Sequence, residues 1–136
     1  MTEPIAPSVL VVDDDEGVAL TFSRMLRLHG YRVRTATTPE GGLALVSAQI
    51  PDAIILDLRM PLVNGVEFLR RLRTNDAHRA TSVTIVTGDY FIEDDMAAEI
   101  KALGAQVCFK PLWVDDLVLV VRNMLGSPPP PATACA

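Results

Sequence analysis

The strongest constraint on the fold is an alternation, repeated five times, between short apolar runs and longer segments with helical periodicity. The first run, residues 8–13, stays apolar until Asp13, which is typical of a strand buried on both faces. From Asp15 the apolar residues recur at helical spacing up to Gly30, a residue that readily ends a helix. Alternating strands and helices predict a parallel sheet with right-handed crossovers and helices on both faces. We therefore predict a doubly wound α/β domain.

The other four strand and helix pairs follow the same pattern. Thr38 and Pro39 supply a cap and a first residue for the second helix, although Gly41 and Gly42 weaken that helix in isolation. The expected strands are 31–36, 53–57, 83–87 and 106–110, and the expected helices are 40–48, about 66–73, about 91–103 and 114–125. The expected organisation is an N-terminal extension at 1–7, one domain at 8–126 and a proline-rich tail or linker at 127–136.

Length, charge and hydropathy exclude several classes of function. The 136 residues suit a single domain. The net charge of −5 argues against a nucleic-acid-binding surface, because such a surface needs clustered Lys and Arg to neutralise phosphates. No apolar run approaches the roughly 18 residues of a membrane span, and no signal sequence opens the chain. We expect a soluble, cytoplasmic protein that binds neither nucleic acid nor membrane.

Polar residues collect at the expected carboxyl ends of the strands, where ligands bind in open α/β sheets. Asp13 and Asp14 follow the first strand, and Asp57 ends the third. Thr87 ends the fourth strand and Lys110 the fifth. Three carboxylates packed together repel one another unless a cation lies among them, and an oxygen-lined site suits Mg²⁺. One carboxylate oxygen can then attack phosphorus, while the hydroxyl and the ammonium bind the phosphoryl oxygens.

Four segments carry a resemblance to a known family. They are Val-Leu-Val-Val-Asp-Asp-Asp-Glu, Leu-Asp-Leu-Arg-Met-Pro-Leu-Val-Asn-Gly, Ile-Val-Thr-Gly-Asp and Phe-Lys-Pro-Leu. Together they resemble the signatures of response-regulator receiver domains, the CheY-like domains of two-component signal transduction, over about residues 8–125. The resemblance implies a (βα)5 sandwich whose five parallel strands have the order 2-1-3-4-5. It also implies that Asp57 accepts a phosphoryl group from a histidine kinase or a histidine phosphotransfer protein.

The same resemblance assigns roles to the other site residues. Thr87 and Lys110 would hold the phosphoryl oxygens. Mg²⁺ would be held by the side chains of Asp14 and Asp57 and the main-chain carbonyl of Arg59, with Asp13 acting partly through water. The protein would then be a phosphorylation-activated switch and not an enzyme, apart from its own phosphorylation and autodephosphorylation.

The route of signal output is expected to differ from that of many receivers. Val107 stands where the family commonly has Tyr or Phe, so signalling by rotation of an aromatic ring is expected to be absent. Output would rely on movement of the Thr87–Gly88 segment and the helix that follows it. A homodimer or an effector is expected to use the face made by the fourth helix, fifth strand and fifth helix.

Simpler interpretations and other functions stay open at this point. Residues 13–15 could merely cap the next helix, and Lys110 alone would usually be a solvated lysine. The protein could also be a pseudo-receiver that binds partners without being phosphorylated. A phosphohydrolase of the haloacid dehalogenase type ranks lower, because Arg59 replaces the general-acid Asp two positions beyond Asp57.

Overall fold

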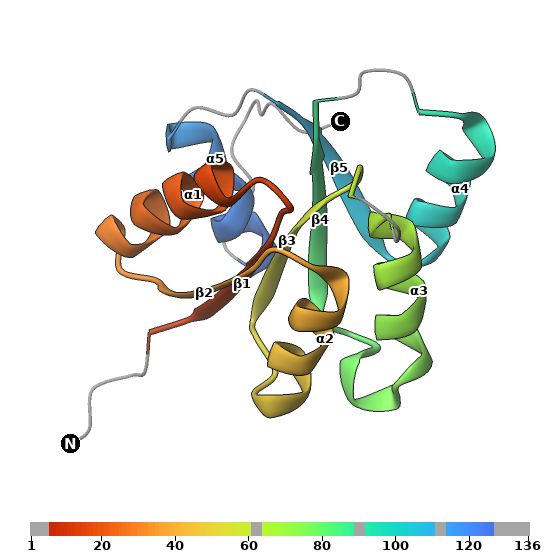
Figure 1. Ribbon diagram of the computed structural model, residues 1–136, viewed down its shortest axis with the longest axis horizontal. Helices are drawn as coiled ribbons and strands as arrows, with labels where there is room; N and C mark the ends of the chain where they lie inside the picture. The colour runs from red at the N-terminus through yellow and green to blue at the C-terminus, as the bar shows by residue number, and fades with distance from the viewer. Residues whose placement is uncertain (1–5, 61–63, 89–91, 111–113, 127–136) are drawn as a thin grey trace.

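The computed structural model describes residues 6–60, 64–88, 92–110 and 114–126 (Figure 1). Five strands form one sheet in the order β2-β1-β3-β4-β5, and all neighbouring pairs are parallel. The strands are β1 (Ser8–Val12), β2 (Arg32–Ala36), β3 (Ala53–Asp57), β4 (Ser82–Thr87) and β5 (Ala105–Phe109). The predicted fold class and strand order are confirmed.

Helices cover both faces of the sheet, with α1 and α5 on one face and α2, α3 and α4 on the other (Figure 1). Their bounds are α1 (Glu16–Leu28), α2 (Pro39–Ala48), α3 (Gly65–Thr74), α4 (Asp94–Ala102) and α5 (Val114–Met124), with a 3-10 turn η1 (Asp76–His78) after α3. Among the described residues, no helix is long and apolar enough to cross a membrane.

The start of α4 corrects the expectation of a helix from about residue 91. Residue 91 lies outside the described residues, and the helix begins at Asp94. Glu93 precedes it with a ψ of 146°, which is not helical, and its side chain makes no capping hydrogen bond. The acidic residues at this point therefore mark the helix start, where negative charge is favoured by the free amides.

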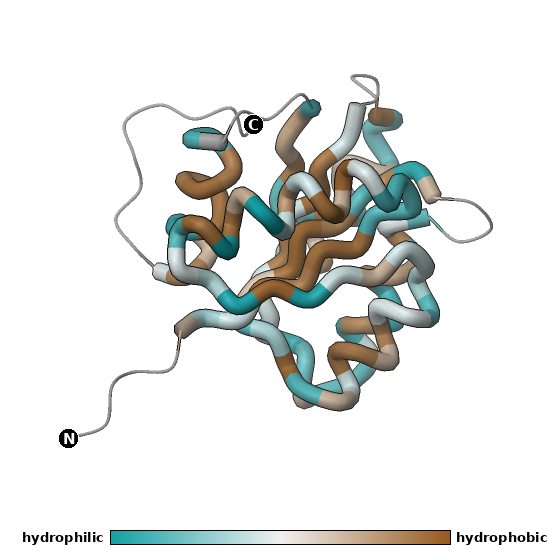
Figure 2. Tube along the Cα trace, turned by 60° about the vertical axis from the view of Figure 1, so that its left-hand side comes forward, coloured by the Kyte–Doolittle hydropathy of each residue, from teal (hydrophilic) through white to brown (hydrophobic). Residues whose placement is uncertain are grey.

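The core consists of two layers, one on each face of the sheet. Every residue of β1 and β3 is buried, as predicted for strands covered on both faces. Alternate side chains point to opposite faces, so Leu10 and Ile54 pack toward α2 and α3 while Val9 and Ile55 pack toward α1 and α5. Figure 2 shows these apolar central strands enclosed by the helices. The strands that carry the carboxyl edge of the sheet are thus held by a packed apolar core on both faces.

The glycine in the middle of α2 allows a close contact between layers. A Cβ atom added to Gly42 would lie 2.9 Å from Phe68 Cε2 and 3.0 Å from Val12 Cγ2. The residue that weakens the isolated helix is therefore the one that lets the helix pack closely against β1 and α3. At the amino end of the same helix, the predicted cap is confirmed, because the Thr38 side chain accepts a hydrogen bond from the Gly41 amide.

Candidate functional site

Three carboxylates meet at the carboxyl ends of β1 and β3, which are neighbours in the sheet. In the sheet, β1 has β2 on one side and β3 on the other. Strand order therefore reverses between β1 and β3, and ligands of open α/β sheets bind at such a point. Asp13 and Asp14 follow β1 directly, and Asp57 is the last residue of β3. One carboxylate oxygen of each lies within 4.8 Å of the others. The structure thus brings together the three acidic residues predicted from the sequence.

The carboxylate of Asp57 is electrostatically unfavourable in its ionised form. Asp57 is only 7% exposed, and Asp13 beside it is 3% exposed. Burial, and after it the charge of Asp13, raise the pKa of Asp57 from 3.8 to about 6, and Asp14 adds to the effect. The positive charge of Lys110 opposes the shift but does not cancel it. A cation among the three carboxylates would relieve this repulsion.

Lys110 brings a positive charge to the same group of residues. Its Nζ lies 3.0 Å from Asp13 Oδ2 and 3.6 Å from Asp57 Oδ1. Burial disfavours the charged ammonium, but the hydrogen bond and charge of Asp13, together with Asp57, outweigh it and raise the pKa of Lys110. The Lys110 amide also donates to the Thr87 carbonyl at 2.8 Å, which ties the ends of β4 and β5 together. The lysine is therefore a fixed part of the site, and its side chain is not simply solvated.

Thr87 and Arg59 complete the set of predicted residues. Thr87 is 1% exposed and lies one residue beyond Val86, the β4 residue paired with Asp57. Arg59 lies two residues after Asp57 and is exposed. That its carbonyl binds a metal stays a prediction.

The aspartates that follow β1 have two different roles: one caps α1, and another belongs to the acidic site. Asp15 is the cap of α1, since its side chain accepts a hydrogen bond from the Val18 amide at 3.1 Å. Asp13 instead uses Oδ1 to accept from the Asp15 amide at 2.9 Å and Oδ2 to accept from Lys110. Helix capping therefore accounts for Asp15 but not for the position of Asp13 beside Asp57.

A positioning residue that the sequence interpretation did not single out is Gly65, the first residue of α3. A Cβ atom added there would lie 2.5 Å from the main-chain oxygen of Asp57 and 3.1 Å from Leu58 Cα. The Gly65 amide also donates to the Leu58 carbonyl at 2.8 Å. Asn64 in front of it caps α3 through the Glu67 amide. The available signal was the Asn-Gly pair, which indicates a tight turn but not which residue the glycine approaches.

The donor set of this site fits a hard divalent cation. Asp13, Asp14 and Asp57 offer carboxylate oxygens, and the metal that prefers such ligands while keeping several waters is Mg²⁺. The site also contains a carboxylate that can act as a nucleophile, with an ammonium 3.6 Å away. A carboxylate nucleophile beside an ammonium suits phosphoryl transfer, in which positive charge stabilises the transferring group.

Comparisons with known proteins agree with this geometry. The family model described as "Response regulator receiver domain" matches residues 9–122. Transcriptional regulatory protein PrrA of Mycobacterium tuberculosis is 35% identical over 120 residues, which cover 88% of this chain and 50% of that protein. Sporulation initiation phosphotransferase F of Bacillus subtilis is 29% identical over 118 residues, covering 86% of this chain and 92% of that one. The crystal structure of chemotaxis protein CheY4 of Vibrio cholerae matches with a TM-score of 0.81 and 29% identity, over 88% of this chain and 99% of that one. This chain spans about half the length of PrrA.

Proposed function

Because the chain belongs to the response regulator receiver domain family, we propose that it is a phosphorylation-activated switch whose phosphoryl acceptor is Asp57. The phosphoryl donor would be a histidine kinase or a histidine phosphotransfer protein. The observation that carries the proposal is the position of Asp57, a buried carboxylate at the end of β3 with two further carboxylates and the Lys110 ammonium around it. A site built to hold one of its carboxylates at a raised pKa suits chemistry better than fold stability.

In the proposed reaction an oxygen of Asp57 forms a bond to phosphorus while the bond from phosphorus to the donor imidazole nitrogen breaks. The attacking carboxylate must be ionised. Burial and the charge of Asp13 raise the pKa of Asp57 in the metal-free protein, and a cation among the carboxylates would favour the ionised form that attacks. The Lys110 ammonium and the Thr87 hydroxyl would bind the phosphoryl oxygens and offset their charge during transfer. Mg²⁺, held by Asp13, Asp14 and Asp57 with the Arg59 carbonyl, would supply the remaining positive charge.

The test is labelling with a small acyl phosphate in the presence of Mg²⁺, followed by intact mass spectrometry. The wild-type protein should gain the mass of one phosphoryl group, and Asp57→Asn, which keeps the size of the side chain, should gain none. A wild-type protein that gains no mass would indicate a pseudo-receiver. Rapid turnover of unrelated phosphate esters would instead indicate a hydrolase.

Neutralising Lys110 should strengthen metal binding. In Lys110→Met the three carboxylates lose a cation that competes for them, so Mg²⁺ should bind several-fold more tightly. The measurement is isothermal titration calorimetry at about pH 8, where Asp57 stays ionised even though loss of Lys110 raises its pKa further. Lys110→Arg keeps the charge and serves as the control. Equal or weaker affinity in the Met variant would contradict the proposed competition.

We propose that the signal is transmitted by movement of the Thr87–Gly88 segment and α4. Rotation of an aromatic ring cannot transmit it at position 107, because that residue is valine. Val107 is half-buried and packs toward the core layer that includes Ile100 of α4. A cleft of about 530 Å³ between α4 and β5, lined by Ile92, Val107 and Phe109 among others, supports the docking of a second copy or an effector on this face.

A further inference from the structure

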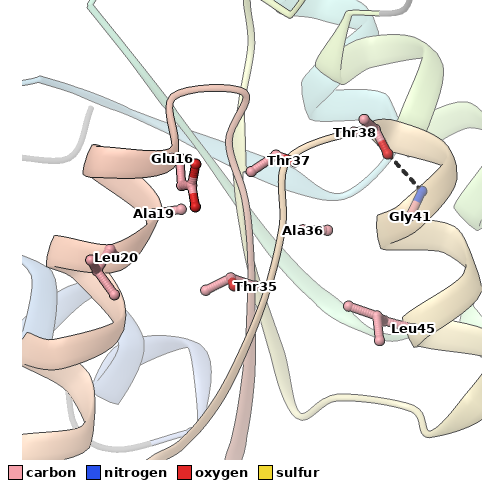
Figure 3. A pocket seen from close by; sticks show the side chains of 9 residues that line it. All are labelled: Glu16, Ala19, Leu20, Thr35, Ala36, Thr37, Thr38, Gly41 and Leu45. Atoms are coloured by element: carbon pink, nitrogen blue, oxygen red, sulfur yellow. Dashed lines mark hydrogen bonds between the residues drawn. The ribbon is translucent and has the colours of Figure 1, made fainter.

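A second cleft, separate from the acidic site, follows the outer edge of β2. It has a volume of about 520 Å³ and lies between α1 and α2 (Figure 3). Thr35 and Thr37 lie at its centre, Glu16 and Leu20 come from α1, and Leu45 comes from α2. Leu20 is 49% exposed, which makes it one of the few large apolar side chains at the surface of the described residues. The cleft therefore combines a strand edge with apolar walls.

The main chain of Thr35 points out of the sheet into this cleft. The neighbouring residues point the other way: the Ala36 carbonyl accepts from the Asp13 amide at 3.0 Å, and the Arg32 amide donates to the Pro7 carbonyl at 2.9 Å. Because main-chain groups alternate in direction along a strand, those of Val33 and Thr35 face away from β1. At the amino end of the strand, α1 already covers this edge, since Arg27 Nη2 donates to the Val33 carbonyl at 2.8 Å.

The carboxyl half of the edge is left open. Within the part of the chain that the structure describes, no neighbouring strand and no side chain bonds to the outward main-chain groups of Thr35. Proteins usually cover or charge such edges, because a row of free amides and carbonyls pairs readily with another extended chain. Here the Arg27 guanidinium covers only the main chain of Val33. The main chain of Thr35, which can still pair, lies inside the cleft.

We propose that this cleft binds an extended segment of a partner protein, which adds to the edge of β2 by main-chain hydrogen bonds to Thr35. Binding by strand addition takes its affinity from the main chain and its specificity from alternate side chains. Because α1 and α2 lie on opposite faces of the sheet, one apolar side chain would pack on Leu20 and the next, on the other face, would pack on Leu45. Another would be basic and lie near Glu16, which is exposed at the carboxyl end of the cleft.

The geometry favours a single extended segment over a second copy of the protein. The helices α1 and α2 stand on both sides of β2 (Figure 3), so an edge-to-edge dimer would have to accommodate two such pairs of helices at the same edge. A lone strand has no flanking helices and fits between them. Since Glu16 lies two residues beyond Asp14, the bound segment would end beside the acidic site.

The binding test uses a blocked heptapeptide with lysine at both ends and valine between them, so that either face of the strand is apolar and an end lysine can reach Glu16, with NMR detection on the full chain. Saturable shifts are expected at the amides around Thr35, together with at least ten-fold slower hydrogen exchange of the Thr35 amide. The matched control is the same peptide with alternate amides N-methylated, which keeps the side chains but cannot pair, and it should bind at least ten-fold more weakly. Equal binding of the two peptides, shifts confined to other surfaces, or an unprotected Thr35 amide would overturn the proposal.

Variants of the protein provide the second arm. Thr35→Pro removes the outward amide but no bond to β1, because proline is tolerated where the N–H of an edge strand faces out. It should weaken peptide binding at least ten-fold, while Thr35→Val should not. Circular dichroism checks that each variant is folded. If Thr35→Pro does not fold, Leu20→Lys, which places a charge on the apolar wall, should weaken binding several-fold. Full affinity in a folded Thr35→Pro or in Leu20→Lys, or dimerisation through β2 seen by sedimentation, would refute the model.

Discussion

Replacing Gly65 with alanine should lower the free energy of unfolding by about 2 to 4 kcal/mol and slow the labelling of Asp57 by an acyl phosphate at least ten-fold. The added Cβ would lie 2.5 Å from the Asp57 carbonyl oxygen, far inside van der Waals contact. The obstacle is main chain and cannot rotate away, so either α3 or the end of β3 must shift. A shift of β3 moves the Asp57 carboxylate relative to Lys110 and Asp13, and positioning is what this kind of transfer depends on.

Urea denaturation gives the stability change, and the rate of mass gain gives the effect on labelling. Labelling is measured at a temperature where both proteins are fully folded, so that lost stability and lost positioning are separated. Gly88→Ala is the stability control, because nothing lies within 4 Å of a Cβ added at that glycine, and its stability should change by less than about 0.5 kcal/mol. A Gly65→Ala protein that is less stable but is labelled at the wild-type rate would show that the glycine serves the fold alone.

Asp57→Asn should make the metal-free protein more stable at pH 8 by about 1 to 3 kcal/mol. Burial and the neighbouring carboxylates raise the pKa of Asp57 from 3.8 to about 6, so the folded state binds this proton more tightly than the unfolded state does. The resulting stabilisation is present below about pH 4, where Asp57 is protonated in both states. It is lost as the pH rises to about 6, and asparagine, which does not ionise, avoids that loss.

The measurement is urea denaturation in a chelator at several pH values between about 4 and 8. The difference in stability between variant and wild type should grow up to about pH 6 and then stay constant. Adding Mg²⁺ should stabilise the wild type more than the variant, because only the wild type has all three carboxylates. If the two proteins keep the same difference at every pH, the pKa of Asp57 is not raised in the folded state.

The sequence determined the layout of the sheet, because the information is local. Continuous apolar runs such as 53–57 are too short for typical helices and rich in β-branched residues, which indicates strands covered on both faces. Five strand and helix pairs in succession leave a parallel sheet as the consistent arrangement. Two helix ends were also predictable from single residues. Thr38 has a side chain that can cap α2, and Gly30 readily adopts the positive φ of 92° found after α1. The start of α4 was the exception, since several acidic residues there could each begin the helix.

The membership of the candidate site also followed from the sequence. Asp13, Asp57, Thr87 and Lys110 stand at strand ends, and in a parallel sheet all carboxyl ends share one edge. Strand order then determines which of them are neighbours, and the order came from the family resemblance and not from the residue pattern. The sequence did not predict that Asp15 caps α1 while Asp13 accepts from Lys110. Aspartates in one run have the same chemistry, and only the conformation of the turn decides where each side chain points.

Distances between segments remote in sequence were decided by the tertiary structure alone. Gly42 and Gly65 look like weak points in helices, yet each is required by an atom of another element at 2.5 to 2.9 Å. The raised pKa of Asp57 depends in the same way on burial and on Asp13, 44 positions earlier in the chain. Composition and periodicity specify which face a residue occupies. How closely two faces approach, and how much water they exclude, is set only when the layers pack.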